Sequence, residues 1–147
     1  MKSLMECSTG VPSLDRVINN LRIGDNVVWQ VDEISDYFQF TAPYVENALK
    51  EGRRVVYMRF AQHGPILQPG QYDQIYMLDS YSGFESFSTQ VHSIIKNEGE
   101  EVYYVFDCLS DLAADWYSDE MLGNFFLLTC PYLYDVSAVA YFAILRN

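Results

Sequence analysis

Residues 26–40 decide the fold of this chain, and they read Asn26-Val27-Val28-Trp29-Gln30-Val31-Asp32-Glu33-Ile34-Ser35-Asp36-Tyr37-Phe38-Gln39-Phe40. The first six residues are apolar on both faces apart from Gln30, which is the pattern of a strand that helices cover on both sides. A helical pattern follows and extends to about Glu51, with Ser35 as its expected N-cap and Gly52 as its expected C-cap. Pro43 lies inside this helix and predicts a kink or a late start. We therefore expect a buried strand that turns through a tight loop into a helix.

Four further apolar runs have strand character, and they cover residues 54–60, 74–78, 102–106 and 136–145. Helical patterns lie between most of these runs. Alternation of strands and helices predicts one α/β domain over residues 1–147. Its core should be a three-layer arrangement in which helices flank a mostly parallel sheet of about five strands.

The remaining helices can be placed from their apolar positions. A short helix capped by Ser13 should precede the first strand and bury one face, formed by Leu14, Val17, Ile18 and Leu21. An amphipathic helix is expected over residues 83–97. A last helical stretch follows Asp107, and we expect it to break near Tyr117 and again at Pro131.

The composition predicts a globular core and argues against some partners. Half of the 147 residues are hydrophobic and 16% are aromatic, which disfavours disorder. The formal net charge of −11 argues against nucleic acid, because phosphate binding needs clustered Lys and Arg. Residues 61–147 carry twelve Asp and Glu against two Lys and Arg. Such an acidic half could face a basic partner, or its charges could simply keep exposed loops solvated.

Cysteine usage and hydropathy favour a cytoplasmic protein with no membrane contact. The three cysteines are far apart and form no CxxC pair, which fits a reducing compartment. The two histidines do not complete a metal-ligand set, so we expect neither metal nor cofactor. No apolar run of 18 residues and no signal-peptide pattern is present.

Three segments resemble the RecA-like ATPases, and in particular their KaiC-type members. The opening Ser8–Asp15, which reads STGVPSLD, is similar to the STG-x-P-x-LD opening of that family. Val55–Phe60 is similar to the strand that follows the family's phosphate loop. Val102–Leu112 resembles the strand that ends in the Walker B aspartate, here Asp107. The resemblance covers nearly the whole chain and implies a RecA-like fold.

The departures from this family concern the residues that hold and hydrolyse ATP. A working phosphate loop reads G-x-x-x-x-G-K-[ST], but this chain has neither Gly nor Lys between Gly24 and Lys50. Three carboxylates occupy the loop instead, those of Asp32, Glu33 and Asp36. A phosphate charge about 6 Å from one carboxylate costs on the order of 3 kcal/mol at an effective dielectric constant of about 20. In the family, the catalytic glutamates follow the strand that Val55–Phe60 matches, as Phe-Glu-Glu. This chain has Phe60-Ala61-Gln62 at that place, so the glutamates are absent. The resemblance therefore implies a degenerate, non-hydrolysing domain.

Polar residues nevertheless gather where ligands bind in open α/β sheets, beyond the carboxyl ends of the strands. The candidates for a remnant pocket that takes a cation or a basic group are Asp32, Gln62, His63, Asp79, Asp107 and Asp111. The alternative is that polar residues end strands because the chain must turn there.

Individual side chains allow similar pairs of readings. Asp107 and Asp111 could form an acid–base pair, or they could be an inherited Walker B residue and a helix N-terminal residue. His63 could be a general base or a loop residue, and Cys108 a nucleophile or a packed residue. His92 is expected on the solvated side of its helix. Near Trp116 and Pro131, an aromatic contact patch is conceivable from Tyr117, Tyr132 and Tyr134, with core packing as the alternative.

The family's strand order adds an expectation about partners. In that order the last strand lies between the first strand and the strand that ends in Asp107. Asn26–Val31 would then be an apolar edge strand, and exposed edges invite pairing with another chain. We expect a protein partner, a further domain or a second subunit to cover it.

Three hypotheses about function follow. The first is a non-catalytic domain that regulates or scaffolds through protein–protein contacts. The second is an accessory domain of a phosphotransfer enzyme of the PEP/pyruvate type, suggested by a faint resemblance of Gly24–Asp32 and Cys130–Leu133 to such proteins. The third is a small-ligand sensor that uses the carboxyl edge of the sheet.

Overall fold

A five-stranded parallel sheet forms the centre of the computed structural model, which describes residues 6–146. Its strands lie in the order β3-β7-β6-β4-β5, and each pairs with its neighbours in parallel. Their bounds are β3 (Asn26–Val31), β4 (Val55–Arg59), β5 (Gln74–Met77), β6 (Tyr103–Cys108) and β7 (Val139–Leu145). The predicted α/β fold with about five strands is therefore confirmed.

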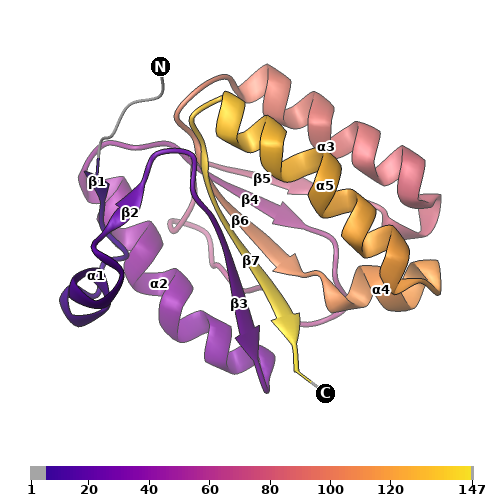
Figure 1. Ribbon diagram of the computed structural model, residues 1–147, viewed down its shortest axis with the longest axis horizontal. Coiled ribbons are helices and arrows are strands. Elements are labelled where there is room, and N and C mark those ends of the chain that lie inside the picture. The colour runs from indigo at the N-terminus through magenta and orange to yellow at the C-terminus, as the bar shows by residue number, and fades with distance from the viewer. Residues whose placement is uncertain (1–5, 147) are drawn as a thin grey trace.

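Helices cover both faces of this sheet and complete the three layers (Figure 1). On one face lies α2 (Ile34–Lys50), which buries Tyr37, Tyr44, Val45 and Ala48 against the strands. On the other face lie α3 (Phe84–Glu98), α4 (Ser110–Trp116) and α5 (Asp119–Asp135), with a short 3-10 turn, η1 (Ser80–Ser82), before α3. Two aromatic-rich cores result, one on each side of the sheet.

The N-terminal segment packs beside α2. Here β1 (Glu6–Cys7) pairs antiparallel with β2 (Leu21–Arg22), and α1 (Pro12–Ile18) connects them. The predicted short helix before the first strand is present as α1, but its expected cap and buried face were wrong. Its N-cap is Val11, no residue of α1 is buried, and Val17 is 81% exposed. The helix ends at Ile18, since Asn19 takes a left-handed conformation, so the expected fourth member of its apolar face lies in β2 instead.

The loop between β3 and α2 is a structural corner in which two of the three carboxylates cap the helix. Glu33 is the N-cap, two residues before the expected Ser35. The Glu33 N–H donates to Asp36 Oδ2 at 3.3 Å, and the Glu33 carboxylate accepts from the Asp36 N–H, which makes a reciprocal capping box. At the other end, Gly52 follows the C-cap residue with a φ of +75°. Glycine is favoured at such a left-handed position after a helix.

Both prolines inside predicted helices lie within continuous helices. Because α2 begins well before Pro43, the late start that Pro43 could have caused does not occur. The break expected at Pro131 was wrong, because α5 continues to Asp135. The carbonyl that Pro131 leaves without a donor belongs to Leu127, whose side chain is 74% exposed, so this carbonyl lies on the solvent side of the helix. The longer helix also delays the last strand, which begins at Val139 rather than Val136.

The position of β7 between β3 and β6 confirms the predicted strand order. Among residues 6–146, strand β3 pairs only with β7, so it is an edge of the sheet, as expected. Strand β5 is the other edge.

Candidate functional site

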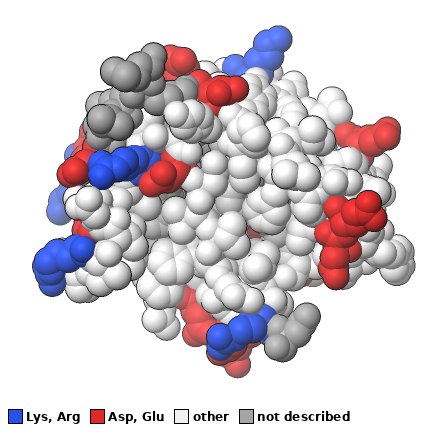
Figure 2. All heavy atoms as spheres, viewed as in Figure 1, with Lys and Arg blue, Asp and Glu red and all other residues white. Residues whose placement is uncertain are grey.

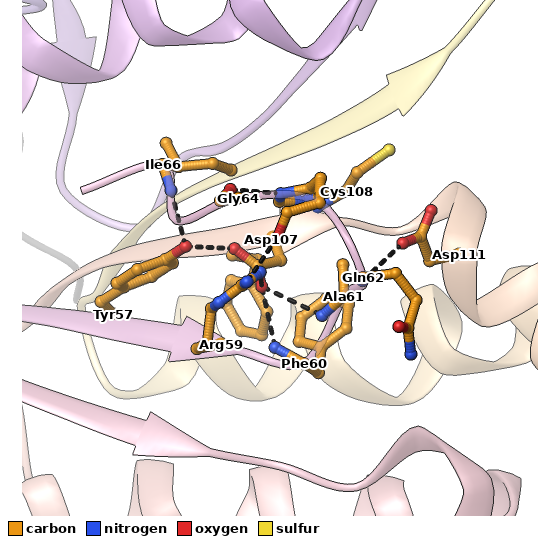
Figure 3. A network of polar contacts seen from close by, with 12 residues as sticks. Tyr57, Arg59, Phe60, Ala61, Gln62, Gly64, Ile66, Asp107, Cys108 and Asp111 are labelled. Carbon is orange, nitrogen blue, oxygen red and sulfur yellow. Dashed lines mark hydrogen bonds and ion pairs between the residues drawn. The ribbon is translucent and has the colours of Figure 1, made fainter. Parts of the chain in front are cut away.

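The carboxyl edge of the sheet centres on Asp107, near the end of β6. Asp107 is fully buried at the end of β6. One of its oxygens, Oδ2, accepts from Arg59 Nη1 at 2.7 Å and from the backbone N–H groups of Phe60 at 2.8 Å and Ala61 at 3.0 Å. The other, Oδ1, accepts from the hydroxyl of Tyr57 (Figure 3). This carboxylate therefore has four protein donors, including a guanidinium.

The network around Asp107 also holds the loop that follows β4. Arg59 donates through Nη2 to the carbonyl of His63, and the Tyr57 hydroxyl accepts from the Ile66 N–H at 2.9 Å. Burial, and next the charge of the Asp107 carboxylate, raise the pKa of Tyr57 well above its usual range. Tyr57 is therefore a neutral donor at ordinary pH. What lies at this edge is a packed, internally paired corner.

The imidazole of His63 is part of the same corner. Its Nε2 accepts from the Cys108 N–H at 3.1 Å, and its Nδ1 lies 2.8 Å from the carbonyl of Gly64. With the Cys108 N–H donating to Nε2, the ring hydrogen that faces the Gly64 carbonyl is on Nδ1. Both nitrogens are engaged with the backbone, so His63 holds the loop in place.

The other predicted site residues have separate partners. Asp111, in the first turn of α4, accepts from the Gln62 N–H at 3.0 Å, and this contact joins the Asp107 corner. Asp79 caps η1 by accepting from the Tyr81 N–H at 2.9 Å. Asp32 forms an exposed ion pair with Arg146, at 2.8 Å. The structure thus brings together Gln62, His63, Asp107 and Asp111, and it engages Asp32 and Asp79 elsewhere.

Cys108 and His92 do not have the environments expected of reactive side chains. Cys108 is buried, and this burial raises the pKa of its thiol, which is the opposite of what activates a nucleophilic cysteine. His92 has intermediate exposure, so it is less solvated than predicted. Its Nε2 lies 3.0 Å from the Thr129 hydroxyl, its ring packs edge-on against Tyr132, and burial lowers its pKa.

The residue that sequence reasoning missed is Arg59. It ends the apolar strand β4 next to the strand that ends in Asp107, and its side chain is only 14% exposed. The sequence does hold a signal for Arg59. It is a single cation at the end of a buried strand, and a carboxylate lies at the end of another buried strand.

The segment Ser8–Asp15 also has a structural role. The Asp15 carboxylate accepts from the Ser8 hydroxyl at 2.6 Å and from the Thr9 N–H at 2.8 Å. Gly10 lies so close to α2 that an added Cβ would be 2.1 Å from the Pro43 carbonyl oxygen, and its φ is +81°. The motif thus closes a turn on itself and packs it against α2.

Strand β3 offers a second candidate site, at the open edge of the sheet. Val28 is 44% exposed there. Helix α5 runs alongside, because Asn26 Nδ2 donates to the Cys130 carbonyl at 3.3 Å and Gly24 lies against the Tyr134 ring. Leu127, three residues before Cys130 and on the same side of α5, is 74% exposed. We call Val28, Leu127 and Tyr134 the edge patch.

The space on the other side of β3 is also open. A cavity of about 470 Å³ lies between α1 and the strand, with Leu14 and Ile18 on one wall and Val27 and Trp29 on the other. Figure 2 shows this side of the molecule, and the surface over β3, β7 and α5 is nearly free of charged side chains. Lys, Arg, Asp and Glu lie around its rim. A mostly uncharged face is unusual on a chain with a net charge of −11.

The aromatic patch considered from the sequence does not form. Tyr117 precedes α5 and Tyr134 lies near its end, so a helix of 17 residues separates them. Trp116 packs edge-on against Phe84 and Phe87. Of these aromatic residues, Tyr134 is the one that joins the β3 edge.

Within residues 6–146, no three His, Cys, Asp or Glu side chains gather as a metal ion would require. No helix in that range has both the length and the apolarity needed to cross a bilayer. No model of a known protein family matches the chain, and no curated protein matches it.

Proposed function

We propose that this chain is a non-catalytic, RecA/KaiC-like domain that acts through protein–protein contact, in a regulatory or scaffolding role. The observation that carries the proposal is the exposed, uncharged edge strand β3 with the edge patch beside it. Edge strands of folded proteins are usually blunted by charge, proline or short length. Strand β3 has six residues, no proline and no charge.

The Asp107 corner supports the non-catalytic part of the proposal. In an ATPase of this type the aspartate must organise Mg²⁺ at a bound nucleotide. Here Arg59 supplies the positive charge and two backbone N–H groups fill the remaining positions on Oδ2. A metal ion would have to displace a buried ion pair, which is costly.

The corner between β3 and α2 supports the same part. Glu33 and Asp36 cap α2, and Asp32 is paired with Arg146. Helix N-termini bind phosphate through free N–H groups, and here carboxylates of the chain itself occupy that position. The strand order β3-β7-β6-β4-β5 is the one that the RecA-like resemblance implies, and it supports placing the chain in that class of fold.

A photo-cross-linking experiment tests the contact. Benzoylphenylalanine is introduced at Val28 of the full chain, and the protein is irradiated inside the cells from which it comes. Met77 on the other edge strand, 73% exposed, is the matched control position. We expect a covalent protein adduct from position 28 and none from position 77. No adduct from position 28 would contradict the contact, and calorimetry that shows micromolar binding of Mg·ATP would contradict the non-catalytic assignment.

A further inference from the structure

The main-chain groups of β3 point alternately towards β7 and away from the sheet. The Asp25 carbonyl accepts from the Ala140 N–H at 3.1 Å, and the Val31 carbonyl accepts from the Arg146 N–H at 2.8 Å. The N–H and C=O groups of successive residues in a strand point in opposite directions within the sheet. The N–H and C=O groups of the odd-numbered residues of β3 therefore point towards β7. Asn26, Val28 and Gln30 therefore direct their N–H and C=O groups outward. Among residues 6–146, no backbone group or side chain hydrogen-bonds to these outward groups.

The outward N–H and C=O groups of Asn26, Val28 and Gln30 can pair with those of a second β3 strand related by a two-fold axis. If two β3 strands run antiparallel with Val28 opposite Val28, then Asn26 lies opposite Gln30 at both ends. Every outward residue of one strand then faces an outward residue of the other, and each such pair exchanges both its N–H···O bonds. A shift of this register by two residues leaves at least one of the three outward residues opposite a position outside the strand.

The same register places apolar side chains together on both faces. Val28 meets its own copy on the face of α5, where Leu127 and Tyr134 extend the contact. On the opposite face Val27 meets Trp29 of the second strand, an aromatic and β-branched pair of the kind that stabilises adjacent strands. That pair lies beside the cavity between α1 and β3, where space is available.

Electrostatics permits this pairing despite the net charge of −11. The register sets Asp25 opposite Val31 and Asp32 opposite Gly24, so no two carboxylates of the strands face each other directly. The charges lie at the rim of the face in Figure 2 and repel over longer distances. Such repulsion is screened beyond about 8 Å at physiological ionic strength.

The other edge of the sheet does not offer an equivalent surface. Strand β5 has four residues. Its Tyr76 hydroxyl donates to Glu98, which also pairs with Arg54, so charged groups lie beside this edge. Short strands and nearby charges are the devices that discourage edge pairing.

We infer that the partner on the β3 edge is a second copy of this chain, paired antiparallel through its own β3, with Val28 on the two-fold axis. The two five-stranded sheets then form one continuous sheet. This inference rests on the proposed function and specifies its partner.

Disulfide trapping tests the register directly. Val28→Cys is made in a Cys130→Ser background, because Cys130 lies beside the edge, and the protein is oxidised mildly at a concentration where the chain self-associates. In a hydrogen-bonded antiparallel pair the Cα atoms are about 5.5 Å apart, which a disulfide spans. Gln74→Cys on β5, in the same background, is the control. We expect a covalent dimer from Val28→Cys alone. No dimer from Val28→Cys, or equal yields from both positions, would overturn the inference.

A second variant measures the affinity. Val28→Lys sets two ammonium groups against each other on the two-fold axis, and Val28 lies at the edge, so the fold should persist. Sedimentation analysis should show a dimer dissociation constant at least about ten-fold higher than that of the native chain, equivalent to about 1.4 kcal/mol. The control Met77→Lys should leave it unchanged. Equal dissociation constants for Val28→Lys and Met77→Lys would overturn the inference.

The photo-cross-linking experiment separates this inference from the proposed function. An adduct from position 28 to a different protein, with no self-adduct, overturns self-pairing and leaves the contact role intact. No adduct of either kind overturns both.

Discussion

At the scale of single residues, the ion pair between Arg59 and Asp107 determines what the carboxyl edge can do. Asp107 is fully buried and Arg59 nearly so, and the two are 2.7 Å apart. A buried pair of this kind contributes little over an apolar pair of the same shape, but losing one partner leaves an uncompensated buried charge. The pair therefore has a structural role, and removing one partner should lower the free energy of unfolding.

Replacing Arg59 with Ala should lower the free energy of unfolding by about 3–5 kcal/mol, because Asp107 loses its cation and remains buried. The control is Arg146→Ala, which removes the exposed pair with Asp32 and should cost about 0–1 kcal/mol. Urea denaturation of both variants and of the native chain gives the comparison. Similar losses for the two variants would show that the buried pair has no special role.

His92 should make stability depend on pH near neutrality. Burial lowers its pKa in the folded chain, whereas the unfolded chain has the ordinary value of about 6.5. Below pH 6.5 the unfolded chain binds a proton that the folded chain resists, so this contribution is present above pH 6.5 and lost as the pH falls. The variant His92→Gln should show a flatter stability profile between about pH 5 and 7, measured by urea denaturation. Parallel profiles for variant and native chain would contradict this.

At the scale of elements, the sequence predicted the strands and their order better than it predicted the N-terminal helix and the last one. Buried strands have long apolar runs with few alternatives, which made β3, β4 and β6 recognisable. Helix α1 has apolar residues at helical spacing, but its seven residues end before the expected face is complete. In α5, tertiary packing outweighs the effect of Pro131, which cannot be read from the residue alone.

The turn of Ser8–Asp15 packs closely against α2 at Gly10. Gly10→Ala should destabilise the fold by about 2–4 kcal/mol, because the new Cβ meets the Pro43 carbonyl at 2.1 Å and φ is positive. Gly70→Ala is the control, since Gly70 also has a positive φ but nothing lies within 4 Å of the added atom. It should cost about 1–2 kcal/mol. Chemical denaturation of the two variants separates the steric clash from the backbone strain, and equal losses would show that the close approach to α2 is unimportant.

At the scale of the whole molecule, a strongly acidic chain has one nearly uncharged face and one unprotected sheet edge, and the two coincide (Figures 1 and 2). The exposed edge could be predicted, since a strand order alone determines which strand is terminal. The site at the carboxyl edge could be predicted only in part. Gln62, His63, Asp107 and Asp111 do gather there, but their internal pairing depends on Arg59, Tyr57 and backbone donors that only the folded chain brings together.

Salt should strengthen self-association. Raising the ionic strength from about 0.01 M to about 0.15 M shortens the screening length from about 30 Å to about 8 Å and weakens the repulsion between two acidic molecules. The apolar and main-chain contacts across β3 are unaffected. Sedimentation analysis at the two salt concentrations should therefore show a larger dimer fraction at the higher one. A dimer that dissociates as salt is added would point to an interface held by ion pairs.

Residue-resolved amide hydrogen exchange tests whether association occurs through the open edge of β3. The N–H groups of Val27 and Trp29 face β7, and those of Val28 and Gln30 face outward. We predict that Val27 and Trp29 are protected at every protein concentration, whereas Val28 and Gln30 are protected at high concentration and lose that protection on dilution. Exchange of Val28 and Gln30 at the unprotected rate at every concentration would show that the molecules do not associate through β3.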